Sequence, residues 1–322
     1  MRDSGAVLGC QSGDDDPTMK LVYLGSPEAA VPPLRALVDA GHEMMLVVSQ
    51  PDRRRGRGSA LSPSPVKAAA LELGLPTTDD VAAVLDAAAR GAELGVVVAY
   101  GKLIRPHLLR ALPFLNIHFS LLPRWRGAAP VERALLAGDT ETGVCLMGLE
   151  EGLDTGPVFR RVVTPIDPDE PVSALRDRLV VIGTEVLVDA LRDGFASLGS
   201  PEPQSGNVTH AAKLEPAEFR IEWARPTTEL HRLIRLGLAW TTFRGKRLKV
   251  LAASPVRAGA PPDGAPLDAV PGSVVVGTCV ATGDGWLELT TVQPEGKSPM
   301  NVAAWRNGFH PGSDEVLGVS ST

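Results

Sequence analysis

A polar side chain stands at alternate positions of one apolar run, at Asn116, His118 and Ser120. If this run is the end of a strand, alternate side chains leave the same face, so the three polar groups converge. Farther along the chain, Asp154 lies between glycines in the run GLDTG, whose backbone can approach other groups closely. An amide, an imidazole and a carboxylate are together a suitable set for the transfer of an acyl or formyl group.

Each of the three residue types has a task in such a transfer. When an amine attacks a formamide carbon, the carbonyl oxygen becomes an oxyanion, which the Asn116 amide and a charged His118 could stabilise. The amine must lose a proton, and a carboxylate paired with a histidine can accept it directly or through a water. A simpler interpretation stays open, because a histidine at a strand end is more often a hydrogen-bonded core residue, and an aspartate between glycines is more often a turn residue.

Composition limits the classes of protein to consider. The chain has 322 residues, of which 44% are apolar and 22% are charged, and this is typical of a soluble globular protein of two domains. The formal charge of −6 argues against indiscriminate binding of nucleic acid, although a local basic patch could still bind it. Cys10, Cys145 and Cys279 follow no metal-ligand or disulfide spacing, which favours a reducing compartment, the cytoplasm. No metal site is expected, because His118 has no second ligand two or four residues further on.

The first residues differ from the rest. Residues 1–18 contain acidic runs and no apolar core of signal-peptide length, so we expect a disordered leader rather than an export signal. Met19 stands directly before the first apolar run and is an alternative start of translation. No stretch approaches the ~20 apolar residues that a membrane span needs, so no membrane partner is expected.

From Lys20 onward, apolar runs alternate with helix-like segments. Continuous Val, Leu and Ile runs separated by helices indicate strands that are buried on both faces of a parallel sheet. The sequence therefore predicts an α/β, Rossmann-like domain over residues 19–200, with a mainly parallel sheet and flanking helices. Gly25 alone does not make the glycine-rich dinucleotide fingerprint, so a nucleotide cofactor is not implied. The expected strands are 20–25, 44–49, 94–100 and 115–120, and the expected helices are 28–40 and 66–73.

A second composition follows a polar stretch rich in Pro and Gly. We expect a linker at 201–216 and a smaller C-terminal domain at 217–322, with a helix near 227–236 and several short strands. The Asp284-Gly285 pair between two alternating runs indicates a hairpin whose tight turn has positive φ at its centre. A small antiparallel barrel or sandwich is the predicted architecture of this domain.

Ordered motifs along most of the chain carry a more specific signal. The run NIHFSLLPRWRGAAP (116–130), with GDTETGV (138–144) and GLDTGPVF (152–159), closely resembles the methionyl-tRNA formyltransferase family. The resemblance continues in YLGSPEAA, SQPDRRRGRG, VVVAYGKLI, THAAKL with RIEW, ATGDG and QPEGK. It implies an enzyme that moves the formyl group of 10-formyltetrahydrofolate onto the methionine of charged initiator tRNA, without a metal and as a monomer.

The resemblance also implies site residues. It makes Asn116, His118 and Asp154 the catalytic trio, and it makes Ser120, Leu121, Leu122 and Pro123 the lining of the folate pocket. Gln50 to Lys67 matches a loop that reaches into the tRNA acceptor arm, and the C-terminal domain becomes an OB-like barrel that binds tRNA. Seven Lys and Arg against one acid between Arg225 and Lys249 suit that task. The implied tRNA-binding residues are Arg53, Arg54, Arg55, Arg57, Lys213, Arg244, Lys246, Arg247, Lys249 and Lys297.

Alternatives stay open at this point. The core motif is shared with sugar-nucleotide formyltransferases, glycinamide ribonucleotide transformylase and formyl-folate hydrolases, whereas the RWRGAAP run, the arginine-rich loop and the basic C-terminal domain favour the tRNA enzyme. An alternative of another class is a non-catalytic tRNA-binding relative, which would have no need of the intact trio. The family usually has a Pro-containing stretch before the Trp at position 240, and its absence here puts the affinity for tRNA in question.

Overall fold

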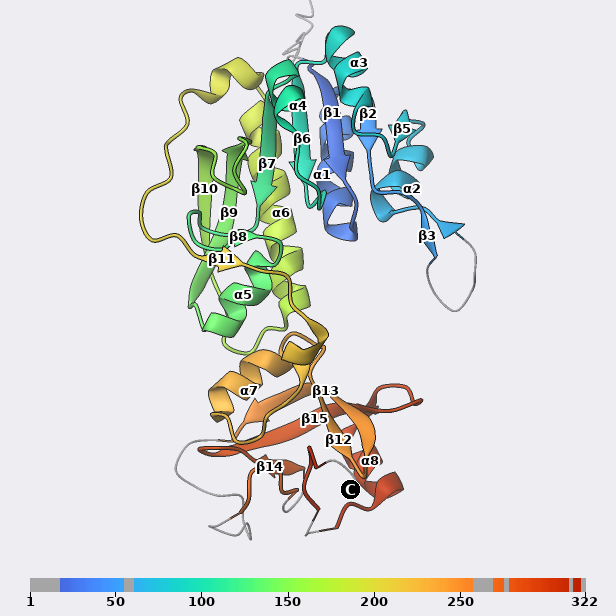
Figure 1. Ribbon diagram of the computed structural model, residues 1–322, viewed down its shortest axis with the longest axis vertical. Helices are drawn as coiled ribbons and strands as arrows, with labels where there is room; N and C mark the ends of the chain where they lie inside the picture. The colour runs from blue at the N-terminus through green and yellow to red at the C-terminus, as the bar shows by residue number, and fades with distance from the viewer. Residues whose placement is uncertain (1–17, 55–60, 257–268, 275–277, 313–314, 320–322) are drawn as a thin grey trace, which may run out of the picture. The chain divides into compact units, whose positions relative to one another are not determined.

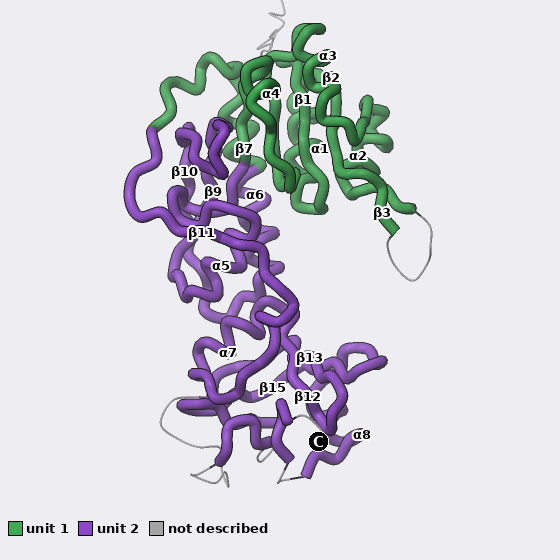
Figure 2. The backbone as a smooth tube through the Cα atoms, viewed as in Figure 1, with its two compact units in different colours: residues 1–116, 184–202 green, residues 117–183, 203–322 purple. Residues whose placement is uncertain are grey.

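A computed structural model describes residues 18–54, 61–256, 269–274, 278–312 and 315–319 (Figure 1). The predicted leader lies outside the described residues except for Thr18. The chain forms two compact units, one of residues 1–116 and 184–202, the other of residues 117–183 and 203–322 (Figure 2).

The first unit contains four strands that pair in parallel. β1 (Lys20–Gly25) pairs in parallel with β2 (Glu43–Val48) and with β6 (Leu94–Val98), and β2 pairs in parallel with β5 (Thr77–Thr78). Every residue of β1 after the first is buried, as expected for a strand covered on both faces. The helices of this unit are α1 (Val31–Asp39), preceded by the turn η1 (Glu28–Ala30), α2 (Pro65–Glu72), α3 (Ala83–Ala89) and α4 (Pro106–Ala111), with η2 (Phe195–Leu198) near its end.

With β7 (Phe114–His118), β9 (Glu141–Gly148) and β10 (Val158–Pro165), the seven-stranded sheet has the order β10-β9-β7-β6-β1-β2-β5. Together with the parallel pairs of β1, β2, β5 and β6, this confirms the prediction of a mainly parallel sheet with flanking helices. β9 and β10 pair antiparallel, an arrangement that no pattern in the sequence predicts. The predicted strand 94–100 ends early, at Val98, because Ala99 and Gly101 take φ of 46° and 77° and turn the chain. The unit boundary falls within β7 (Phe114–His118), and α6 (Val172–Leu191) also runs through a boundary.

The C-terminal part of the second unit is an antiparallel sheet, as predicted. β12 (Trp240–Phe243), β13 (Lys246–Pro255), β15 (Trp286–Pro294) and β14 (Cys279–Ala281) follow one another in that order, and β16 (Met300–Asn301) also pairs with β15. The described residues form a sheet in this order, and closure into an OB-like barrel stays a prediction. The associated helices are α7 (Thr227–Ile234), α8 (Val302–Phe309) and the turn η3 (Pro216–Phe219), and α5 (Pro130–Ala137) also belongs to this unit. Among the helices of the described residues, none combines the length and apolar character that crossing a bilayer needs.

The predicted hairpin is present, but its predicted turn is wrong. Ala281 pairs with Trp286, so the loop has four residues, closed by a hydrogen bond from the Thr282 N–H to the Gly285 carbonyl. Neither Asp284 nor Gly285 has positive φ. Asp284 instead accepts hydrogen bonds from the Thr227 backbone N–H at 2.7 Å and hydroxyl at 2.8 Å, so the hairpin caps the start of α7. These bonds, the backbone one first, lower the pKa of Asp284.

The predicted linker is also more structured than its composition indicated. β11 (His210–Ala211), inside the predicted linker, pairs in parallel with β8 (Arg126–Gly127). The Thr209 hydroxyl accepts a hydrogen bond from the Trp125 N–H at 2.8 Å, and the Ala211 carbonyl accepts from Ala128 and Ala129 at 2.8 and 3.1 Å. We call residues 203–211 the linker strap, because they lie along the segment that follows β7.

Candidate active site

His118 is the last residue of β7, and its side chain is only 6% exposed. Its Nε2 lies 2.9 Å from the carbonyl oxygen of Trp125. Because a carbonyl can only accept, Nε2 carries the hydrogen of this bond. The other ring nitrogen, Nδ1, faces the carboxylate of Asp154 at 3.6 Å from Oδ2 and is the nitrogen at which the ring can gain or lose a proton.

Asp154 is held by the backbone rather than by the imidazole. Its Oδ2 accepts a hydrogen bond from the Gly127 N–H at 2.8 Å, whereas the 3.6 Å to His118 is too long for a hydrogen bond. The carboxylate side chain is 13% exposed, so its attraction to a charged imidazole is only partly screened by water. The structure therefore brings these two predicted catalytic residues together, with a fixed carboxylate beside a proton-carrying ring.

Backbone strain concentrates around this pair. Trp125 and Asp154 are non-glycine residues with left-handed φ of 62° and 50°, and Gly127 has φ of 128°. The conformation of each of the two non-glycine residues costs about 1–3 kcal/mol and persists only where the surroundings impose it, which is common at functional sites, whereas glycine adopts positive φ without that cost. The Trp125 conformation presents its carbonyl to His118, and the Asp154 conformation presents its carboxylate to the Gly127 N–H.

The other two polar residues of the predicted strand end differ from each other. Asn116 is buried two residues before His118 on β7, so the two side chains leave the same face of the strand. Ser120 lies beyond the strand, which ends at His118, and its buried hydroxyl donates to the Arg124 carbonyl at 2.6 Å. The expectation that Ser120 continues the strand face is therefore wrong, since it closes the turn that follows β7.

The predicted folate-lining residues after Ser120 have distinct surroundings. Leu122 is buried in an apolar cluster with Cys145, Met147 and Val158, and its peptide bond to Pro123 is cis. Leu121 lines a cavity of about 360 Å³ together with the segment 138–142, Arg124 and Trp125. His118 and Asp154 do not line that cavity. A folate-binding role for Ser120, Leu121, Leu122 and Pro123 stays a prediction.

Sequence reasoning missed several residues that hold the pair in place. The Trp125 carbonyl and the Gly127 N–H contact the two catalytic candidates, and Gln204 and Thr209 of the linker strap bond to the same segments. The run RWRGAAP pointed to the first two only through the resemblance. No pattern around Gln204 or Thr209 predicts a role at the site, because the polar composition of this segment is typical of a linker.

The basic loop of the first unit is described only at its ends. Arg53 and Arg54 are exposed on β3 (Arg53–Arg54), which pairs antiparallel with β4 (Leu61–Ser62). The Lys67 ammonium, at the start of α2, lies 2.7 Å from the Asp52 carboxylate and holds the base of the loop. Arg55 and Arg57 lie outside the described residues.

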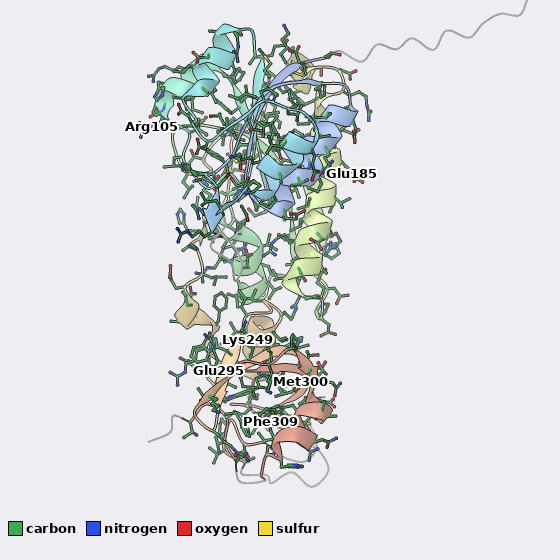
Figure 3. All side chains as sticks on the ribbon, turned by 90° about the vertical axis from the view of Figure 1, so that its right-hand side faces the viewer. Arg105, Glu185, Lys249, Glu295, Met300 and Phe309 are labelled. Atoms are coloured by element: carbon green, nitrogen blue, oxygen red, sulfur yellow. The ribbon has the colours of Figure 1, made fainter. Side chains whose placement is uncertain are left out.

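Basic residues of the C-terminal sheet fall into two groups. On the strand pair β12–β13, Trp240 stands opposite Lys249, which Figure 3 labels, and the Arg247 guanidinium lies 4.3 Å from the centroid of the Trp240 ring. Lys246 is exposed on the same strand. Arg244, by contrast, forms an ion pair with Glu315 through two of its nitrogens, which occupies its guanidinium.

The remaining two predicted lysines are exposed. Lys297 follows β15 in the turn at 294–297, and Lys213 follows the linker strap. Each offers an ammonium group to solvent, and a role in binding tRNA stays a prediction for both.

Other chemistries find less support in the described part of the chain. No three His, Cys, Asp or Glu side chains in the described ranges come together in a way that would hold a metal ion. Burial raises the pKa of the Cys145 thiol, and burial followed by the charge of Glu288 raises that of Cys279, so neither thiol is activated as a nucleophile.

Comparison with known proteins agrees with this geometry. The formyl transferase family matches residues 19–191, and the formyl transferase C-terminal domain matches residues 213–310. The methionyl-tRNA formyltransferase of Roseobacter denitrificans is 45% identical over 304 residues, which are 90% of this chain and 96% of that protein. That of Jannaschia sp. is 44% identical over 315 residues, which are 93% of this chain and 100% of that protein.

Two solved structures share the fold at low identity. HypX from Aquifex aeolicus, in complex with tetrahydrofolic acid, superposes with a TM-score of 0.64 at 17% identity, over 92% of this chain and 48% of that chain. The N-formyltransferase from Helicobacter canadensis, in complex with folinic acid and dTDP-3-aminofucose, gives a TM-score of 0.60 at 14% identity, over 86% of this chain and 100% of that chain. The matched family patterns and the identity to whole relatives place this chain in the formyl transferase family, among the methionyl-tRNA formyltransferases.

Proposed function

We propose that this enzyme transfers the formyl group of 10-formyltetrahydrofolate to the free amino group of methionine on methionyl-initiator tRNA. The observation that carries the proposal is the approach of His118 Nδ1 to Asp154 Oδ2, at 3.6 Å, with the carboxylate held by the Gly127 N–H. Such a pair can take a proton from an attacking amine and return it to a leaving nitrogen. Both nitrogens in the proposed reaction need one of these transfers.

In the proposed step, the amine nitrogen attacks the formyl carbon and forms a new C–N bond, while the carbonyl electrons move to oxygen. The oxygen electrons then re-form the C=O bond while the bond between the formyl carbon and the folate N10 breaks, and the electron pair of the broken bond leaves with N10. The proton lost by the amine passes to His118 Nδ1, directly or through Asp154, and His118 Nδ1 then donates a proton to N10. One proton and one formyl group therefore exchange places between the two nitrogens.

We assign the oxyanion to Asn116 and His118. Asn116 is buried on the strand face that it shares with His118, so its amide N–H acts in a water-poor surrounding, where a hydrogen bond to a developing charge contributes most. Ser120, Leu121, Leu122 and Pro123 are assigned to the folate pocket.

The proposed tRNA contacts lie on the basic loop and on the C-terminal sheet. Lys246 and Lys249 on β13 are the strongest candidates, because neither forms an ion pair within the described residues, whereas Arg244 is paired with Glu315. Phosphate contacts of this kind give affinity that falls with salt. We further propose that the enzyme is a cytoplasmic monomer, with a catalytic domain at 19–200, a linker at 201–216 and a tRNA-binding domain at 217–322.

One assay separates the proposal from its alternatives. Purified protein is incubated with formyl-labelled 10-formyltetrahydrofolate and one of three acceptors: charged initiator tRNA, an amino-sugar nucleotide or water alone. We expect formyl-methionyl-tRNA as the main product. Preferred labelling of the sugar would make the chain a sugar formyltransferase, release of formate alone would make it a hydrolase, and tRNA binding without transfer would make it a non-catalytic relative.

A further inference from the structure

The amide of Gln204 connects the linker strap to the backbone of the catalytic loop. Its Nε2 donates to the carbonyl oxygens of Asp154 and Gly156, at 2.8 and 2.7 Å. Its Oε1 accepts two hydrogen bonds from the guanidinium of Arg126, at 3.0 Å from Nε and 2.6 Å from Nη2. Both the oxygen and the nitrogen of this half-buried amide are therefore hydrogen-bonded to the protein.

Only an amide of this length meets both requirements. The two carbonyls need a donor with two hydrogens, and the guanidinium needs an acceptor, so the orientation of the amide follows from its partners. A glutamate would satisfy Arg126 but would place an acceptor against two carbonyl oxygens. A lysine would satisfy the carbonyls but would place a positive charge against Arg126.

These contacts form a closed ring around the catalytic carboxylate. Gly127, the neighbour of Arg126, donates its N–H to Asp154 Oδ2 at 2.8 Å, and Gln204 joins Arg126 to the Asp154 carbonyl. The side chain of Asp154 and its main chain are therefore both fixed to the β8 segment, one directly and the other through Gln204. Asp154 has the left-handed φ of 50°, a conformation that needs such support.

We propose that Gln204 is a positioning residue that holds the Asp154 loop in the conformation that sets the carboxylate beside His118. The inference rests on the proposed function for its kinetic readout, because Gln204 acts on the reaction only through Asp154. It also gives the linker strap a task beyond joining two domains, since the strap supplies a residue on which the catalytic loop depends.

The experiment compares Gln204→Ala and Gln204→Glu with the parent enzyme and with Asn207→Ala. Asn207 is an exposed amide of the same strap, so its substitution controls for altered composition of this segment. Both Gln204 variants should lower kcat by roughly 10- to 100-fold with KM for tRNA and for formyl-folate within about twofold, because small misplacement of a reacting group costs rate rather than binding. Asn207→Ala should match the parent.

A double-mutant cycle tests whether the effect passes through Asp154. In an Asp154→Asn background, Gln204→Ala should reduce kcat by less than about twofold, because residues that act as a unit are not additive. Full additivity would overturn the proposal, as would a parental kcat in Gln204→Ala, parental activity in Gln204→Glu, or a change confined to KM for tRNA.

Hydrogen exchange of the Gly152–Gly156 loop supplies a readout that does not need activity. Loss of the two Gln204 bonds should raise the exchange rate of this loop in Gln204→Glu, which keeps the acceptor for Arg126, and not in Asn207→Ala. Unchanged exchange would refute the positioning role even if Gln204→Ala failed to fold. A parent enzyme that transfers no formyl group would defeat the proposed function, whereas the exchange result would still decide the role of Gln204.

Discussion

Gly127→Ala is the substitution for which the structure gives the clearest expected consequence. A Cβ built on Gly127 would lie 2.7 Å from the carbonyl oxygen of Ala211 and 3.2 Å from its carbon. The residue also has φ of 128°, which side-chain-bearing residues rarely adopt. Alanine therefore has to rotate the backbone, displace the linker strap, or both.

The cost has two parts. Holding a non-glycine residue in this region of φ costs about 1–3 kcal/mol, and crowding a packed backbone costs about 1–3 kcal/mol more. We therefore expect the free energy of unfolding to fall by about 2–6 kcal/mol. Any shift of the Gly127 N–H also moves the partner of Asp154 Oδ2, now at 2.8 Å, and a displacement near 1 Å costs about 10²-fold in rate.

Urea unfolding and initial rates of formyl transfer at saturating substrates measure the two effects. Gly206→Ala is the matched control, because Gly206 belongs to the linker strap, has φ of 105° and has no atom within 4 Å of its built Cβ. It should lose stability through its backbone alone and keep its kcat. Parental kcat in Gly127→Ala would refute the inference that this N–H positions the Asp154 carboxylate for the proposed reaction.

Three further results are expected. His118→Ala should lower turnover by at least about 10²–10⁴-fold while the protein remains folded, because proton transfer and oxyanion stabilisation each contribute about that much. Steady-state rates measure the turnover and circular dichroism measures the fold; near-parental turnover would contradict the prediction. Lys246→Ala and Lys249→Ala should each raise KM for tRNA and reduce the slope of log affinity against log salt by about 0.7–0.9, because each removes one phosphate contact. Titrations at several salt concentrations measure the slope, and an unchanged slope would remove that residue from the tRNA contacts. The hydrogen bond from Arg244 lowers the pKa of Glu315. This carboxylate therefore stabilises the fold above its unfolded pKa, and the stabilisation is lost as the pH falls through its folded pKa. The urea midpoint should fall less steeply from pH 7 to pH 3 in Arg244→Ala than in the parent, and parallel curves would contradict the assignment.

The parts of the fold that the sequence predicted well are those with a strong local pattern. β1 occupies its expected residues, 20–25, because a continuous apolar run ends at a glycine, and α2 begins within a residue of its expected start because Ser64 caps it before a proline. α7 likewise begins at its expected residue, Thr227. The proposed catalytic pair followed from residue types together with the family motifs, and the structure brings His118 and Asp154 within 3.6 Å.

The parts that were missed depend on contacts between distant segments. β8 and β11 have two residues each, too few to show a hydrophobic period, so the sequence predicts only a linker where the linker strap lies. Gln204 lies 50 residues from Asp154 in sequence, and nothing local to either residue indicates their bond. Dipeptide preference placed positive φ at Asp284-Gly285, whereas the Asp284 carboxylate bonds to Thr227 and the loop opens to four residues.

The cap on α7 has a consequence for the order in which the chain becomes structured during synthesis. Pro226, directly before the helix, provides no side-chain bond to its first turn, and the carboxylate that does so lies 57 residues downstream of Thr227. A ribosome that adds roughly 5–20 residues per second needs about 3–11 s to make that stretch. During this interval the first turn of the emerging helix lacks its anchor, so the C-terminal domain is expected to acquire its final form late, after the Asp284 hairpin has left the exit tunnel.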